Sequence, residues 1–333
     1  MLLKELTQAF GVSGYEKEVR ELIKGVVKDL ADDVSVDALG NLIVFKKGAG
    51  KEKKRIMLAA HMDEIGLQVT KIEDNGQIKV KNLGHHFIPT LYMNRVRFRN
   101  GTVGVVNSTV KIEDAKTDIT KLYVDIGTKS RAETLKYVRI GDVACNVGEY
   151  TELQDGCLIA KAMDDRLGCY IMVEVLKKLE SPENDLYFVF TVQEEVGCRG
   201  ARVAAERINP DIGIAVDITP AHDYPCDLEG SNTLGAGTAI KVSDTSVICD
   251  EYLVEEMAKC CEESNIPYQY DVIYVGGTDA SSINRSNNGV RAAGISVVTR
   301  FPHSPNSMVS RKDVEASIAL LSGYINRKFD LER

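Results

Sequence analysis

The stretch F-V-F-T-V-Q-E-E-V-G-C-R-G-A, Phe188 to Ala201, contains the pattern around which the rest of the chain is arranged. It opens with an apolar run that predicts a strand buried on both faces of a mixed or parallel sheet. Two carboxylates follow, Glu194 and Glu195, and a glycine-containing turn then leads into a predicted helix. Adjacent acids at the end of a buried strand are electrostatically unfavourable unless positive charge lies near them. We therefore expect other parts of the chain to help bind cations beside these two carboxylates.

Composition limits the class of protein. The 333 residues are 44% hydrophobic and 27% charged, which is ordinary for a globular protein of one large or two medium domains. The net charge of −8 argues against nucleic-acid and anionic-membrane partners, and no apolar run approaches the roughly 20 residues that span a bilayer. The eight cysteines include no C-x-x-C pair and the N-terminus lacks a signal-peptide pattern, so we expect reduced thiols and a cytoplasmic location.

The hydrophobic pattern divides the chain into two domains. Residues 1–63 and 161–333 alternate buried-strand and amphipathic-helix patterns, which predicts a discontinuous α/β domain. Residues 64–160 contain short alternating runs separated by Asn75-Gly76 and Asn100-Gly101, the strongest short hairpin signal. We expect this segment to be an inserted, β-rich domain.

Local signals near the two ends of the chain predict helix boundaries. Ser13 and Glu16 form an S-x-x-E pattern, which predicts a capping box at the start of a helix over about 15–30. The last amphipathic pattern predicts a helix over 311–329.

Polar clusters follow several predicted buried strands, and another opens a helix. They are His61/Asp63, Glu194/Glu195, Asp217 and His303 at strand ends, and Asp164-Asp165 at a helix start. Because strand ends gather at one edge of an open α/β sheet, we expect these side chains to converge. Imidazole and carboxylate ligands without cysteine suit zinc, cobalt or manganese. The sequence therefore indicates a metal site that contains two divalent cations.

Each cluster also has a structural interpretation when it is taken alone. His61 can be a hydrogen-bonded strand-end histidine, Asp217 a helix cap, and His303 part of a rigid turn between prolines. Asp164 and Asp165 can simply favour the positive end of a helix dipole. Their joint occurrence favours the metal interpretation.

Six motifs closely resemble those of the TET-type dinuclear metal aminopeptidases, which include the glutamyl and deblocking aminopeptidases of the zinc-exopeptidase superfamily. They are A-A-H-M-D-E-I-G (59–66), A-M-D-D-R-L-G (162–168), Q-E-E-V-G-C-R-G-A (193–201), A-V-D (215–217), G-G-T-D-A (276–280) and H-S-P (303–305). The resemblance runs nearly end to end. It implies a mixed-sheet, phosphorylase/hydrolase-like α/β catalytic domain with an inserted β-barrel-like dimerisation domain.

The resemblance also implies a role for each site residue. One metal ion would be bound by His61 and Asp217 and the other by Glu195 and His303, with Asp164 bridging the two. Spacing alone does not choose between the two adjacent aspartates; the family pattern places the bridge at the first.

The remaining implied roles concern proton transfer and the substrate. Asp63 would orient His61, and Glu194 would be the general base for a metal-bridged water nucleophile. Thr278 and Asp279 would line the substrate site. The implied cofactors are two divalent ions, zinc or cobalt, with manganese also suitable.

The implied function is the removal of N-terminal residues from peptides with a free N-terminus. The alternatives are a dinuclear metal-dependent carboxypeptidase or N-deacylase on the same scaffold, and a non-enzymatic assembly module with structural metals. The resemblance further implies dimers assembled into a hollow tetrahedral dodecamer. Neither the preferred N-terminal side chain nor the physiological metal follows from the sequence.

Three departures from the family pattern stand out. Cys198 replaces a common leucine, which we expect to be a harmless apolar exchange. His85-His86 is atypical and is expected to lie in a surface loop of the inserted domain, with contact to an active site as the alternative; His222 is expected to be structural.

Overall fold

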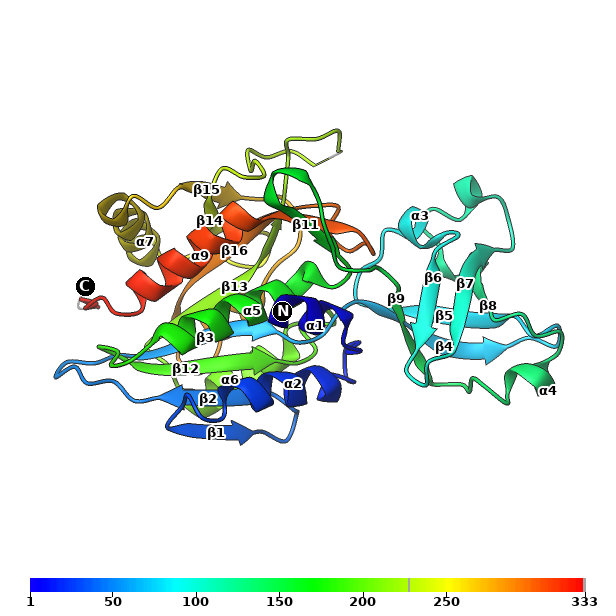
Figure 1. Cartoon of the computed structure of the whole chain (residues 1–333), viewed down its shortest axis with the longest axis horizontal. Coiled ribbons are helices and arrows are strands. Elements are labelled where there is room, and N and C mark those ends of the chain that lie inside the picture. The colour runs from blue at the N-terminus through cyan, green and yellow to red at the C-terminus, as the bar shows by residue number, and fades with distance from the viewer. Residues whose placement is uncertain (227, 332–333) are drawn as a thin grey trace.

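A large mixed sheet covered by helices and a separate closed β-barrel make up the structure (Figure 1). This computed structural model describes residues 1–226 and 228–331. In Figure 1 the barrel lies on the right, largely in cyan, and the sheet with its helices lies on the left. The predicted α/β fold with an inserted barrel is confirmed.

The central strands of the large sheet bring four chain segments to one edge. Within the described residues the sheet has eleven strands, nine of which follow the order β1 (Asp33–Val36), β2 (Leu42–Lys46), β12 (Asp185–Thr191), β3 (Arg55–His61), β13 (Ile212–Pro220), β16 (Arg291–Arg300), β17 (Ser307–Ser310), β11 (Cys157–Ala160), β10 (Thr151–Glu152). The other two are β14 (Thr238–Ser243), which pairs with β16, and β15 (Tyr268–Val272), which pairs with β14. The neighbours β12, β3, β13 and β16 are parallel, so their carboxyl ends meet at the same edge.

Helices cover both faces of this sheet. One face carries α1 (Leu2–Gln8), α2 (Lys17–Val27), α5 (Met163–Lys178), α7 (Glu251–Ser264) and α9 (Arg311–Tyr324). The other carries α6 (Arg199–Ile208) and α8 (Asp279–Asn284). Among the described helices, none combines the length and apolar character needed to cross a membrane.

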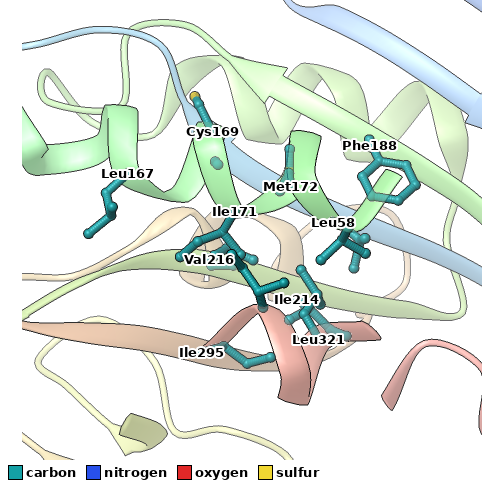
Figure 2. Close-up of a cluster of buried hydrophobic side chains, with 14 of the residues drawn as sticks. Leu58, Leu167, Cys169, Ile171, Met172, Phe188, Ile214, Val216, Ile295 and Leu321 are labelled. Carbon is teal, nitrogen blue, oxygen red and sulfur yellow. The ribbon is translucent and has the colours of Figure 1, made fainter. Parts of the chain in front are cut away.

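The main core lies between the sheet and α5. Figure 2 shows Ile171 and Met172 of α5 above Leu58 of β3 and Ile214 of β13, with Leu321 of α9 nearby. All five side chains are fully buried. The carboxyl ends of β3 and β13, which carry site residues, are therefore fixed by dense apolar packing.

The barrel closes in the order β4 (Gly66–Ile72), β5 (Ile78–Leu83), β8 (Leu122–Asp125), β7 (Val103–Ser108), β6 (Arg95–Phe98), β9 (Val143–Asn146). Its connections contain α3 (Ile88–Leu91), α4 (Arg131–Thr134), and the short 3₁₀ turns η1 (Ile112–Asp114) and η2 (Ile119–Lys121). The Asn-Gly pairs at 75–76 and 100–101 form the predicted hairpin turns. The predicted insertion runs to Ala160, whereas β10, the 3₁₀ turn η3 (Gln154–Gly156) and β11 accompany the large sheet.

Two local predictions at helix ends are wrong. The expected capping box does not form, because the Ser13 hydroxyl donates to Asp63 and the Glu16 carboxylate accepts the N–H groups of Gly14 and Gln193. Both side chains therefore bond outside the first turn of α2. The final helix ends at Tyr324 instead of residue 329.

Candidate active site

The turn between β12 and α6 is held in place by side chains from distant parts of the chain. Asn41 accepts the N–H of Val192 (3.0 Å) and donates to the carbonyl of Gly200 (3.0 Å), so it joins the two ends of the turn. Glu16 Oε1 accepts the N–H of Gln193 at 3.1 Å. Neither Asn41 nor Glu16 was identified as a site residue from the sequence, because both contacts span more than a hundred residues.

Asp63 connects this turn to the end of β3. Its Oδ1 accepts the N–H of Glu194 (3.0 Å), and its Oδ2 accepts the N–H of Glu195 (3.2 Å). The Ser13 hydroxyl donates to the same Oδ2 at 2.6 Å. The two glutamates are thus positioned through their backbone, which leaves both of their carboxylates available for chemistry.

Asp164 lies between the two site histidines. Its Oδ1 is 3.0 Å from Nε2 of His61, and its Oδ2 is 3.0 Å from Nε2 of His303. The Nδ1 atoms contact backbone carbonyls, that of Asp63 for His61 (3.1 Å) and that of His85 for His303 (2.8 Å). A carbonyl only accepts, so each Nδ1 carries a hydrogen, and Nε2 is the ring nitrogen that faces the site. This is the ring orientation of a metal-binding histidine.

Asp63 contacts His61 mainly through its main chain. The Asp63 carbonyl is nearer to Nδ1 than the side chain is, since Asp63 Oδ1 lies 3.4 Å from that nitrogen. The orientation of His61 therefore depends on the Asp63 backbone and, more weakly, on its carboxylate.

Two further carboxylates flank this arrangement. Glu195 Oε1 lies 3.6 Å from His303 Nε2 and is buried without a hydrogen-bond partner among residues 1–226 and 228–331. Asp217 offers a ligand atom within 4.8 Å of atoms of His61 and Asp165. It lies inside β13 rather than after it, because that strand continues to Pro220.

The structure distinguishes the two adjacent aspartates that spacing alone left equivalent. Asp164 faces both histidines, whereas Asp165 accepts the backbone N–H groups of His61 (3.1 Å) and Gly168 (2.9 Å). The peptide bond between the two aspartates is cis. Asp165 therefore supports the end of β3 and the start of α5, and Asp164 occupies the centre of the site.

The pKa values reflect a buried excess of acids. Burial raises the pKa of Asp217 well above its usual range, and the nearby charge of Asp164 adds to this effect. Burial likewise raises the pKa of Glu195 to about 7. Burial would lower the pKa of His303, but the charges of Glu195 and Asp164 raise it to about 10. Divalent cations bound beside these carboxylates would supply the compensating positive charge.

The donor set fits divalent cations. The unpaired buried oxygen of Glu195 and the two inward-facing Nε2 atoms are the kind of nitrogen and oxygen ligands that zinc, cobalt and manganese accept. A narrow cavity of about 10 Å³, roughly the size of one water molecule, lies against Asp164, Glu195 and His303.

Glu194 lies beside this donor set. Its Oε2 is 3.8 Å from His61 Nε2, and its Oε1 accepts a hydrogen bond from the Cys198 thiol at 3.1 Å. Burial raises the pKa of Glu194 well above its usual range, although the charge of His61 opposes this shift. Cys198 is therefore not the purely apolar substitute that the sequence suggested.

The two predicted substrate-site residues lie at the start of α8. Thr278 is buried at the N-cap of α8, where its hydroxyl accepts the N–H of Ala280. Asp279 accepts a hydrogen bond from Thr191 at 2.6 Å. Their role in substrate binding stays a prediction.

The barrel loop that contains His85 and His86 reaches the site. The His85 carbonyl accepts from His303 Nδ1, and a side chain at Gly84 would approach Glu195 Oε2. The side chain of His85 is exposed, as expected for a surface loop, whereas His86 is buried, and the alternative that this loop reaches the active site is the one the contacts favour. His222 accepts the N–H of Asn232.

Comparison with protein-family models matches residues 40–320 to the family described as M42 glutamyl aminopeptidase. The chain belongs to this family. It is an aminopeptidase, which is a peptide hydrolase. A second model, AMPT, matches residues 1–22.

Relatives of this M42 chain cover nearly its whole length. A protein of Acetivibrio thermocellus is 46% identical over 321 residues, which are 96% of this chain and 96% of the relative. The lysyl aminopeptidase of Pyrococcus furiosus is 35% identical and covers 97% of this chain and 96% of its own.

Two solved structures share the fold. An aminopeptidase from Desulfurococcus kamchatkensis superposes with a TM-score of 0.92 at 37% identity, over 98% of this chain and 94% of its own. The TET1 peptidase of Pyrococcus horikoshii, which can assemble into a tetrahedron or a large octahedral shell, gives 0.86 at 33% identity, over 97% of this chain and 98% of its own.

Proposed function

We propose that this M42 chain is a dinuclear metal-dependent aminopeptidase, with Glu194 as its general base. The observation that carries the proposal is the placement of Asp164, whose two oxygens each lie 3.0 Å from Nε2 of a different histidine. A carboxylate with one oxygen toward each of two imidazoles is arranged to bridge two cations.

The proposed ligands divide into two sets around that bridge. His61 and Asp217 would hold one cation, Glu195 and His303 would hold the other, and Asp164 would be shared between them. The close approach of the Asp217 and His61 ligand atoms, and the 3.6 Å contact between Glu195 and His303, support this division. The cations, when bound, polarise the scissile carbonyl and lower the pKa of the attacking water.

Glu194 accepts a proton from the attacking water and returns it to the leaving amine. It is suited to this because its Oε2 lies 3.8 Å from Nε2 of His61, which places the carboxylate beside the proposed metal site. Asp63 fixes the backbone of Glu194, so that the base and the neighbouring ligand Glu195 keep their relative positions. Thr278 and Asp279, which begin α8 beside Glu194, remain the proposed substrate-site residues.

Turnover of free and N-acetylated peptides tests the activity. Pairs of short peptides with lysyl, glutamyl and leucyl N-termini, with and without acetylation, are incubated with enzyme that has been supplied with zinc or cobalt. We expect release of the first residue from the free peptides only. Preferential cleavage of the acetyl group, or release from the C-terminus, would favour the N-deacylase or carboxypeptidase alternatives. The lysyl and glutamyl pairs also report the preferred side chain.

We also propose that the chain assembles as a cytoplasmic homo-oligomer, with the barrel as the dimer contact and a tetrahedral dodecamer as the final particle. The assembly of the Pyrococcus horikoshii relative supports this, as do large exposed apolar side chains on the barrel, such as Phe87, Met93 and Val103. The eight cysteines are free thiols, which suits a reducing compartment. Light scattering should give the mass of twelve subunits; a stable monomer would contradict the assembly.

A further inference from the structure

A second group of metal-binding side chains lies beside the proposed dinuclear site. Glu194, Cys198 and Asp279 each offer one ligand atom, and these atoms all lie within 4.8 Å of one another. None of the three is among the five ligands assigned above. They come from three elements that meet at this edge: the turn after β12, the start of α6 and the start of α8.

The contacts within this group leave one buried acceptor unused. The Cys198 thiol donates to Glu194 Oε1 at 3.1 Å and lies 3.5 Å from the carbonyl of Thr278. Thr191 donates to Asp279 Oδ2, but Asp279 Oδ1 has no hydrogen-bond partner within the described part of the chain. Asp279 is only 2% exposed, so solvent does not replace the missing partner. A buried carboxylate oxygen without a partner is unfavourable, and a cation bound beside it would remove that cost.

We propose that Glu194, Cys198 and Asp279 form a third cation site, one that takes thiophilic divalent ions and inhibits the enzyme. A thiolate with two carboxylates suits zinc or cadmium, whereas magnesium and manganese prefer all-oxygen sites. As the metal–sulfur bond forms, the thiol proton leaves to the solvent. Three protein ligands also leave room for a water molecule in the fourth position of a tetrahedral ion.

Occupation of this site removes the general base. Glu194 Oε1, which accepts the Cys198 thiol hydrogen, would become a metal ligand, and its carboxylate could then no longer take a proton from water. This consequence depends on the proposed role of Glu194, whereas binding at the three side chains does not. Excess zinc or cadmium should therefore inhibit an enzyme whose two other metal positions are already filled.

Cadmium titration of the zinc-loaded enzyme tests both the binding of a cation at the third site and the resulting inhibition. Three quantities are followed: cadmium retained per subunit after desalting, the ultraviolet charge-transfer absorbance of a cadmium–thiolate bond, and the rate of peptide cleavage. We expect one retained equivalent with a thiolate signature and a parallel loss of activity. The five assigned ligands carry no sulfur, so exchange of cadmium into the dinuclear site gives no such absorbance.

Three variants test whether the thiolate absorbance and the inhibition arise from cadmium bound at this site. Cys198→Ser keeps the shape of the side chain and should abolish the thiolate absorbance and weaken inhibition, relative to its own uninhibited rate, by at least about 10-fold. Asp279→Asn keeps the thiol and should weaken both readouts. Cys157→Ser changes a half-buried thiol on β11 that does not belong to this group, and should behave like wild type.

The outcomes test the third cation site and the role of Glu194 as general base separately. Unchanged inhibition and absorbance in Cys198→Ser would overturn the third site. Thiolate-bound cadmium at Cys198 without loss of activity would support the site and contradict the role of Glu194 as general base.

Discussion

Glu16 lies at the start of α2, but its carboxylate contacts the active-site turn instead of the helix. Its Oε1 accepts the N–H groups of Gly14 (2.6 Å) and Gln193 (3.1 Å), and the residue is 5% exposed. The neighbouring Ser13 donates to Asp63. A sequence signature usually associated with a helix start thus supplies two contacts that support the base and the metal ligands.

The buried position of Glu16 should make stability depend on pH. Burial, followed by the charge of Asp63, raises the pKa of Glu16 from 4.5 to about 7. Between these values the folded protein keeps a proton that the unfolded chain has released. The stabilisation that comes from protonated Glu16 is therefore complete below pH 4.5 and is lost as the pH rises through about 7. The loss amounts to about 3 kcal/mol of unfolding free energy.

Glu16→Gln keeps an oxygen that can accept both N–H groups but does not titrate. Thermal unfolding of this variant should show a smaller decrease in Tm between pH 5 and pH 8 than wild type, and a higher Tm at pH 8. Glu21→Gln, which changes an exposed side chain on the same helix, is the control. Parallel pH profiles for Glu16→Gln and wild type would contradict the argument.

At the scale of elements, the site depends on how closely α6 approaches the end of β12. The turn between them passes through left-handed backbone at Gln193, Gly197 and Cys198. A Cβ atom at Gly200 would collide with the side chain of Asn41 and with the backbone of Val192. Glycine is therefore required where the helix starts against the strand.

Gly200→Ala should force this turn apart. We expect a loss of about 1–3 kcal/mol in unfolding free energy, the usual cost of overpacking, and reduced turnover because the same turn carries Glu194 and Glu195. Gly25→Ala in α2 is the matched control: its Cβ would meet nothing within 4 Å, and alanine should stabilise the helix by about 0.5–1 kcal/mol. Chemical denaturation of both variants measures the difference. Equal stability of the two variants would show that the close approach of α6 to β12 does not require glycine at position 200.

At the scale of the whole molecule, the parallel strands bring His61, Glu195, Asp217 and His303 to one edge, and α5 adds Asp164. This convergence followed from the sequence, because buried strand runs and terminal acids are local patterns. Spacing alone did not choose Asp164 over Asp165, since that choice depends on which carboxylate faces the two histidines; only the family resemblance favoured Asp164. The contacts of His85 with His303 and of Asn41 with Gly200 join segments 218 and 159 residues apart and leave no local signal.

Removal of metal should destabilise the whole α/β part of the protein. Without cations, buried carboxylates such as Asp217 and Glu195 either repel one another or take up protons. A ligand present at a thousand times its Kd stabilises by about 4 kcal/mol, so a strong chelator should lower Tm and added zinc or cobalt should restore it. Chelator saturated with zinc beforehand is the control. An unchanged Tm after chelation would argue against cations as part of the folded structure.

The central claim is that one of two adjacent glutamates moves protons while the other binds metal. Comparison of Glu194→Gln with Glu195→Gln, by metal content per subunit and by kcat on a free peptide, tests it most directly. We expect Glu194→Gln to keep two divalent ions and to lose about 10²–10⁴-fold in kcat, and Glu195→Gln to lose bound metal. Near-wild-type kcat in Glu194→Gln, or loss of metal from that variant, would contradict it.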